Sequence, residues 1–139
     1  MNSADGTPVT ITAMPALHGP EGSEDLSGDC IGFLLQASDQ PSIYVSGDNA
    51  SMALIDEIAA RYAPIDIAVL FIGGVRHKPV LDGALVTLDN DMAATATRLL
   101  GARRVVPAHI EGWRHFVGDR TDLISAFRRA GIADRLTFS

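Results

Sequence analysis

The chain has 139 residues with 11 basic and 17 acidic side chains, which gives a formal net charge of −6. Its scattered arginines offer no basic face for a nucleic acid, and no apolar run approaches the roughly 20 residues that a membrane-spanning helix needs. We therefore expect a single domain over residues 1–139 and, because no secretory signal is visible, a cytoplasmic protein.

The first part of the chain predicts three strands. Pro8–Met14 alternates around β-branched residues, so we expect a strand that ends at Pro15. The polar, glycine-rich residues 18–29 follow as an exposed loop. Cys30–Gln36 and Ser42–Ser46 are separated by a short polar segment, which predicts two antiparallel neighbours.

The rest of the chain alternates helical and strand patterns. The expected elements are a helix over residues 51–62, a strand over 65–72, a helix over 87–101, a strand over 104–108, a helix over 119–130 and a short edge strand over 135–138. The strand over 65–72 is almost continuously apolar, which predicts an interior strand covered on both faces. This order predicts an α/β fold with a mixed sheet and about three helices.

Three candidate metal ligands each follow a predicted strand: His18, Asp48 and His109. Each also has a plainer interpretation, because a histidine can be a structural hydrogen-bonding group and an aspartate at a strand-to-helix turn can cap the helix. Ligands at strand ends are held by rigid backbone, so the three side chains could converge on one edge of the sheet. Two imidazoles and one carboxylate form a typical metal-binding set.

Four other residues have weaker indications. His77, in a basic turn after the predicted interior strand, could face an anionic substrate or simply be solvated. Trp113 and Phe116 are expected to pack against the loop that carries a candidate ligand. Cys30 is the chain's single cysteine, which excludes an internal disulfide, and its apolar neighbours predict a core residue.

The segments around His18, Ser46-Gly47-Asp48, Ile65–Gly73 and Val106–Phe116 resemble the C-terminal half of the metallo-β-lactamase fold. The resemblance is nearest to metal-dependent hydrolases of the sugar-phosphate lactonase type and covers most of the chain. It implies part of an αββα sandwich, in which two sheets stack between outer helices. Asn49 stands where this family often has threonine.

The resemblance also implies roles for the candidate ligands. His18 would bind one metal, Asp48 would bridge two metals and serve the catalytic step, and His109 would bind the second metal. Zinc is the first candidate, with manganese and iron as alternatives. The implied reaction is hydrolysis of a small-molecule ester, lactone or phosphoester by metal-activated water.

One family feature is missing from the sequence. An H-x-H-x-D-H run, which supplies four ligands in the family, does not occur here. By the resemblance, the N-terminal half is absent and the chain alone is expected to be inactive. Four interpretations stay open: part of a longer protein, a split subunit with a partner chain, self-association that joins two half-sites, or a metal-free pseudo-hydrolase that serves as an interaction module.

Overall fold

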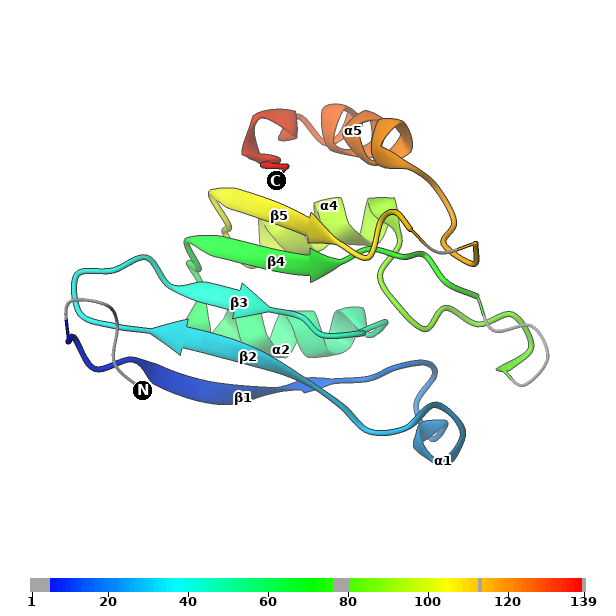
Figure 1. Cartoon of the computed structure of the whole chain (residues 1–139), viewed down its shortest axis with the longest axis horizontal. Coiled ribbons are helices and arrows are strands. Elements are labelled where there is room, and N and C mark those ends of the chain that lie inside the picture. The colour runs from blue at the N-terminus through cyan, green and yellow to red at the C-terminus, as the bar shows by residue number, and fades with distance from the viewer. Residues whose placement is uncertain (1–5, 77–80, 113, 139) are drawn as a thin grey trace.

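The structure is a computed structural model that describes residues 6–76, 81–112 and 114–138. Five strands form one sheet in the order β1-β2-β3-β4-β5 (Figure 1). The strands are β1 (Thr10–Ala16), β2 (Cys30–Gln36), β3 (Ile43–Val45), β4 (Ile67–Phe71) and β5 (Arg104–Ala108). The helices of the described residues are α1 (Glu24–Ser27), α2 (Met52–Tyr62), α4 (Asn90–Leu99), α5 (Arg120–Arg129) and the 3-10 helix η1 (Ala133–Arg135).

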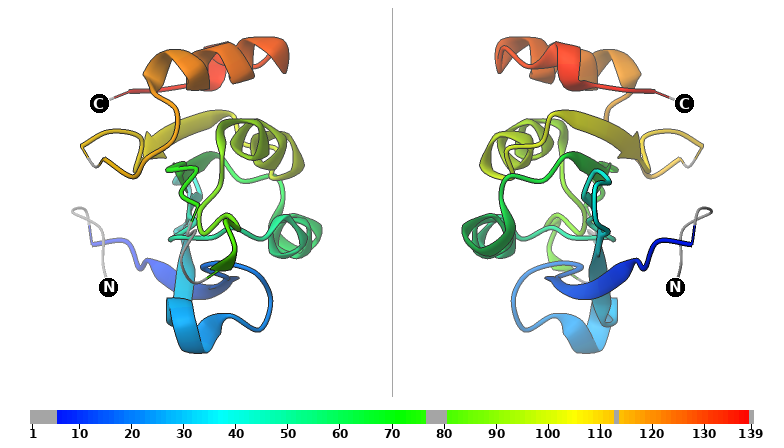
Figure 2. Two further views of the ribbon diagram at one scale, coloured as in Figure 1. Left: turned by 90° about the vertical axis from the view of Figure 1, so that its right-hand side faces the viewer. Right: turned by 90° about the vertical axis from the view of Figure 1, so that its left-hand side faces the viewer.

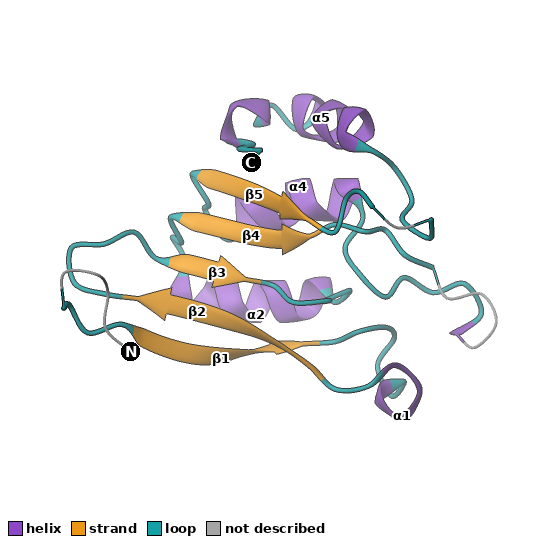
Figure 3. Ribbon diagram, viewed as in Figure 1, coloured by secondary structure: helices purple, strands orange, loops and turns teal. Residues whose placement is uncertain are grey.

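The sheet is mixed. β2 pairs antiparallel with both β1 and β3, whereas β3, β4 and β5 are parallel. Helices α2 and α4 are the connections that parallel strands require (Figure 3). The α/β class and the mixed sheet predicted from the sequence are therefore confirmed.

Polar side chains begin each of the three longer helices. Ser51 accepts a hydrogen bond from Leu54 N at the start of α2, and Asp89 accepts one from Met92 N at the start of α4. Asp119 opens α5 with a capping box. Each cap satisfies backbone N–H groups that have no partner within the helix, and this explains why the predicted helix starts were close.

The core lies between the sheet and helices α2 and α4, which sit together on one face (Figure 2). Leu34, Tyr44 and Leu70 point from the sheet into this core and are fully buried. Helix α5 packs against α4 and contributes the fully buried Leu123 and Phe127. Burial of this one face holds the strands and helices together.

The opposite face of the sheet, called the outer face here, is apolar and partly exposed. Its apolar side chains are Ile11, Ala13, Pro15, Ile31, Phe33, Leu35, Ile43, Val45, Ile67, Val69, Phe71 and Val106. Ile11, Ile31 and Phe33 are 45%, 53% and 39% exposed.

The expectation that β4 is covered on both faces is therefore wrong. β4 is an interior strand between β3 and β5, but only Ala68 and Leu70 are buried, while the residues that alternate with them are half-buried. A continuous apolar run does not by itself say how far each face of a strand is covered.

Several elements also differ from the predictions. Strand β1 continues past Pro15, which pairs with Ile31, because an edge strand has a neighbour on one side only and tolerates the missing N–H on the other. The loop of residues 18–29 contains the single-turn helix α1. Residues 135–138 form no strand: the chain turns as η1, and Leu136 makes one parallel bridge to Val105.

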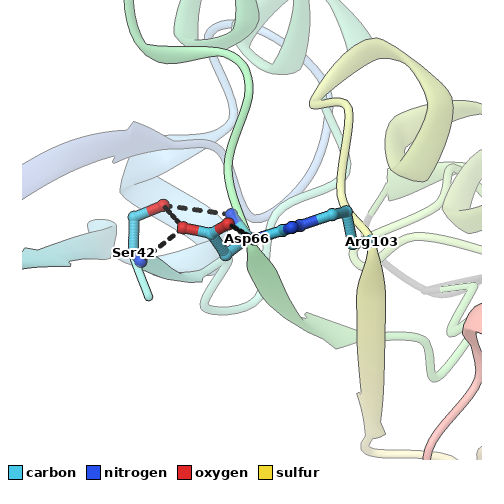
Figure 4. A network of polar contacts seen from close by, with 3 residues as sticks. All are labelled: Ser42, Asp66 and Arg103. Carbon is cyan, nitrogen blue, oxygen red and sulfur yellow. Dashed lines mark hydrogen bonds and ion pairs between the residues drawn. The ribbon is translucent and has the colours of Figure 1, made fainter. Parts of the chain in front are cut away.

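At the N-terminal ends of the parallel strands, one carboxylate joins three segments (Figure 4). Asp66 Oδ2 accepts hydrogen bonds from the backbone N–H of Ser42 at 2.8 Å and from its hydroxyl at 3.0 Å. Asp66 also pairs with Arg103. The Ser42 N–H bond and then Arg103 lower the pKa of Asp66, so this carboxylate stays charged and connects the entries to β3, β4 and β5.

Among the described residues, none of the helices combines the length and apolar character that crossing a membrane requires.

Candidate functional site

The strand directions bring the three candidate ligands to one edge of the sheet. β1 and β3 are both antiparallel to β2 and therefore run in the same direction, as do β4 and β5. His18, Asp48 and His109 come shortly after the carboxyl ends of β1, β3 and β5. The predicted convergence of these three segments is confirmed.

The turn that carries Asp48 is fixed between two fully buried polar residues. On one side, Ser46 Oγ accepts a hydrogen bond from Phe71 N at 3.0 Å and donates to Gly47 O at 2.8 Å. On the other side, Asn49 bonds to the segment after β1. The turn is thus attached to both β4 and the end of β1, and Asp48 lies between the two attachments.

Gly47 is required in this turn. Its φ angle is +60°, a left-handed conformation that glycine adopts at low cost. A Cβ atom at this position would lie 2.5 Å from the carbonyl oxygen of Ile31 in β2. The turn can pack this closely against β2 only because residue 47 has no side chain.

Asp48 and His109 lie side by side. Asp48 Oδ1 is 3.0 Å from His109 Nδ1, and the two side chains are 32% and 40% exposed. Oδ1 itself is buried, yet it accepts no well-formed hydrogen bond from the residues that the structure describes. A buried carboxylate oxygen with an imidazole beside it is a suitable ligand for a cation.

His18 contacts the same turn through its backbone. Its Nδ1 lies 3.3 Å from the carbonyl oxygen of Asp48. Because a carbonyl oxygen only accepts, this contact favours the tautomer with the proton on Nδ1 and a lone pair on Nε2. Metal-binding histidines commonly use this pattern, in which one nitrogen donates to a protein oxygen and the other binds the metal.

Aromatic rings hold His109. Its ring centroid is 4.5 Å from that of Phe71 and 5.5 Å from that of Phe116. The backbone of His109 has a φ angle of +54°, which is uncommon for a residue with a side chain and often marks a functional position. The prediction that Phe116 packs against the ligand loop is confirmed, whereas Trp113 lies outside the described residues.

Cys30 lies beside Asp48 at the start of β2. Burial raises the pKa of its thiol, the Asp48 charge raises it further, and a hydrogen bond from the Asp48 backbone acts in the opposite direction. The sequence predicted a core residue, and this prediction is wrong: the side chain is half-buried and lies outside the hydrophobic core. The reason is that β2 begins at the edge of the sheet where the loops meet.

Two other histidines were considered in the sequence. His77, the predicted substrate contact, lies outside the described residues. His115 packs edge-on against Phe116, with ring centroids 5.0 Å apart. The helix-capping interpretation of Asp48 is wrong, because Ser51 caps α2.

The donor chemistry fits a divalent metal in part. Two imidazoles and a carboxylate are suitable ligands, and the buried Asp48 Oδ1 has an unused lone pair. Within residues 6–76, 81–112 and 114–138, however, no cluster of three or more His, Cys, Asp or Glu side chains could hold a metal ion. By themselves, the three candidate ligands therefore do not form a metal site in the part of the chain that the structure describes.

The polar anchors Ser46 and Asn49 were not predicted from the sequence. Both are short polar side chains in a tight turn, and such residues usually make local bonds within the turn. The available signal was their position on either side of Gly47-Asp48, directly after an apolar strand. Their long-range partners depend on where β1 and β4 lie relative to β3, which only the sheet order reveals.

Comparisons with known proteins agree with this geometry. Residues 2–110 match the family model described as beta-lactamase superfamily domain. The chain is 32% identical over 129 residues to a UPF0173 metal-dependent hydrolase of Thermococcus onnurineus, a match that covers 84% of this chain and 51% of the relative.

Solved structures show the same fold. An isothiocyanate hydrolase from Delia radicum gut bacteria matches with a TM-score of 0.82 and 21% identity, covering 99% of this chain and 54% of the other. A metallo hydrolase from Ignicoccus hospitalis matches with a TM-score of 0.68 and 27% identity, covering 94% and 49%. Metallo-β-lactamase fold proteins are also among the matches.

The chain spans about half the length of the relatives that it matches, as the covered shares of 51%, 54% and 49% show. The match to the family model nevertheless includes all five strands and the candidate ligands His18, Asp48 and His109. The chain belongs to the beta-lactamase superfamily, with the metallo-β-lactamase fold and with relatives that are metal-dependent hydrolases.

Proposed function

We propose that this chain carries part of the centre of a metal-dependent hydrolase that acts on a small-molecule ester, lactone or phosphoester. The observation that carries the proposal is the contact of 3.0 Å between Asp48 Oδ1 and His109 Nδ1, with His18 bonded to the same turn. The names of the relatives support hydrolysis and a metal, while the substrate class and the cytoplasmic location are our extension.

In the proposed centre, His18, Asp48 and His109 hold a divalent metal, with zinc as the first candidate and manganese or iron as alternatives. Such a metal, when bound, lowers the pKa of a water molecule and polarises the substrate oxygen. The Nδ1–H of His18 donates to the carbonyl oxygen of Asp48, which leaves Nε2 as the ligand atom. Phe71 and Phe116 keep the His109 ring in place.

The outer face supports a further part of the proposal. We propose that a second apolar β-sheet covers this face, supplied by the polypeptide that accounts for the remaining length of the relatives. The exposed fractions of 45%, 53% and 39% at Ile11, Ile31 and Phe33 support it, because large connected apolar surfaces mark interaction sites. That polypeptide would also supply the ligands missing from the partial shell.

The test is to measure bound metal and hydrolysis in the purified chain and in any longer form of the protein. The probes are zinc and manganese, and the substrates are generic esters, lactones and phosphodiesters. We expect His109→Ala and Asp48→Asn to lower metal affinity at least tenfold, because each removes a ligand from an incomplete shell. His115→Ala is the matched control, since His115 belongs to the same loop but not to the proposed ligand set.

Each outcome has a defined meaning. Metal binding that His115→Ala leaves unchanged and His109→Ala weakens supports the centre. Hydrolysis by the longer form alone supports completion by a second sheet. Hydrolysis by a dimer of this chain would show instead that a second copy of the chain completes the centre. A longer form that binds no metal would contradict the proposal and favour the alternative of a non-catalytic interaction module.

A further inference from the structure

We infer that Asn49 is a positioning residue that sets the distance between His18 and Asp48, an inference that rests on the metal centre proposed above. Asn49 directly follows Asp48, and its side chain is completely buried at 0% exposure. It touches neither a metal nor a substrate in this proposal. It acts through the two backbone segments that carry the ligands.

Three hydrogen bonds define the role of the Asn49 amide. Its Oδ1 accepts from Leu17 N at 3.0 Å and from Ser51 N at 3.1 Å. Its Nδ2 donates to Ser51 O at 3.0 Å. One buried side chain thus connects the residue before His18 to the start of α2 while sitting next to Asp48.

A second bond runs beside the first. Ala50 N donates to Leu17 O at 2.8 Å, so both polar groups of the Leu17 backbone are held by the segment after Asp48. His18 is the next residue and completes the connection with its contact of 3.3 Å to Asp48 O. Leu17 can therefore not move relative to Asp48 without breaking two bonds in a buried region, where unmade bonds are costly.

The amide group suits this role better than a hydroxyl. Asn49 uses an acceptor with two lone pairs and a separate donor, all on the same side chain. Threonine, which the resembling family often has here, offers a single shorter hydroxyl that cannot reproduce the three bonds. The departure from the family at this position is therefore linked to how this chain fixes His18.

The experiment compares Asn49→Leu and Asn49→Thr with the natural chain by NMR. Asn49→Leu has a similar shape without hydrogen bonds, and Asn49→Thr serves if the leucine variant does not fold. Thr97→Val is the matched control, because Thr97 is also fully buried and its hydroxyl bonds to Ala93 O at 2.7 Å in α4, away from the site. The readouts are exchange of the Leu17 amide, the imidazole signals of His18, and broadening of both ligand imidazoles by Mn²⁺.

In the metal-free protein, we expect Leu17 amide exchange to be at least tenfold faster in the Asn49 variants and the His18 signals to shift, with neither change in Thr97→Val. With Mn²⁺, the natural chain should lose its His18 and His109 signals together. Each Asn49 variant should need at least tenfold more Mn²⁺ than the natural chain to broaden these two signals, since outer contacts of metal ligands typically contribute a factor of about 10–100 in affinity.

The failures are distinguishable. If Mn²⁺ broadens neither histidine in the natural chain or in a longer form, the proposed metal centre is wrong. The positioning role of Asn49 is then still tested by Leu17 amide exchange and the His18 signals of the metal-free protein. If the His18 signals of both Asn49 variants match those of the natural chain, the positioning role of Asn49 is wrong even when the metal binds. Equal changes in Thr97→Val would reduce Asn49 to a general contributor to stability.

Discussion

At the scale of residues, close contacts around the Asp48 turn limit which side chains positions 46, 47 and 49 can carry. Gly47 is pressed against the backbone of β2, and Ser46 and Asn49 each satisfy backbone groups of a neighbouring segment. The Asp48 carboxylate takes no part in this support, and its Oδ1 keeps an unused lone pair. The support and the candidate chemistry are therefore assigned to different, adjacent residues.

Replacing Gly47 by alanine should be more harmful than the same change at Gly131. Both glycines have positive φ angles, +60° and +71°, so both variants carry the left-handed cost of about 1–2 kcal/mol. Only Gly47→Ala also places a Cβ atom 2.5 Å from Ile31 O. We expect the additional loss in unfolding free energy to be about 1–3 kcal/mol, measured by urea denaturation. Equal losses for the two variants would show that β2 moves aside without cost.

The Phe116 ring should hold His109 through stacking. In Phe116→Leu, the centroid contact of 5.5 Å is lost while the site stays apolar. We expect the unfolding free energy to fall by about 1 kcal/mol and metal affinity to weaken by several fold, because aromatic pairs contribute roughly 0.5–1.5 kcal/mol beyond area burial. Unchanged metal affinity in a folded variant would limit Phe116 to packing. Calorimetric titration with zinc provides the measurement.

At the scale of elements, the two ends of the parallel strands have different functions. The carboxyl ends of β3 and β5 lead into the candidate ligands, whereas the opposite ends are joined by Asp66, Ser42 and Arg103 (Figure 4). The Asp66 carboxylate accepts one hydrogen bond from the backbone N–H of Ser42 and one from its hydroxyl. Its other partner, the Arg103 side chain, is 79% exposed. An exposed ion pair contributes little, so Ser42 is the more important partner.

The Asp66 network predicts a pH dependence with a definite sign. The pKa of Asp66 is lower in the folded chain than its ordinary value of 3.8, so the folded state binds this proton less tightly than the unfolded state does. Its contribution is fully present above that ordinary pKa and is lost as the pH falls through the lower, folded-state value. Asp66→Asn should therefore be less stable than the natural chain at pH 7, with the difference shrinking below about pH 4.

Arg103→Gln is the control for this pH effect. It keeps both Ser42 bonds to Asp66 and removes only an exposed partner. We expect Arg103→Gln to lower the unfolding free energy less than Asp66→Asn does at pH 7. In about 0.5 M salt, the difference between Arg103→Gln and the natural chain should disappear. Denaturant midpoints at several pH values give both comparisons, and a larger effect of Arg103→Gln would reverse the assigned order of the two partners.

At the scale of the whole molecule, the sheet has one face covered by helices and one face that is partly exposed. Helices α2 and α4 cover the inner side (Figure 2). The apolar side chains of the outer face remain partly exposed. In register, Phe33 lies opposite Val45, and Val45 opposite Val69, so the apolar surface continues across neighbouring strands. Such a surface favours association with another apolar surface.

Replacing Phe33 by lysine should reduce association of the purified chain. Phe33 is 39% exposed near the middle of the outer face, and a charge there opposes the burial of this surface. Leu26→Lys is the control, because Leu26 in α1 is 64% exposed but lies outside the outer face. Light scattering over a range of concentrations should show less association for Phe33→Lys only. The same behaviour in both variants would mean that general surface charge, and not this face, controls association.

Much of the fold could be predicted because local patterns agree with the final structure. Cys30–Gln36 and Arg104–Ala108 were predicted with their observed bounds, and Asp89 and Asp119 cap the helices that they were expected to open. The shared sheet edge of the three candidate ligands followed from their places after strand ends. The partners of Asn49 and the stacking of Phe71 on His109 could not be predicted, because they depend on which segments become neighbours in space.

The meeting of three distant segments at one edge has a thermodynamic consequence. His18 and Asp48 are 30 positions apart, and His109 comes much later in the chain. A metal held by all three binds only when β1, β3 and β5 are assembled, so binding and folding are linked by mass action. Rising metal concentration would then raise the thermal midpoint of the whole sheet, and a chelator would lower it.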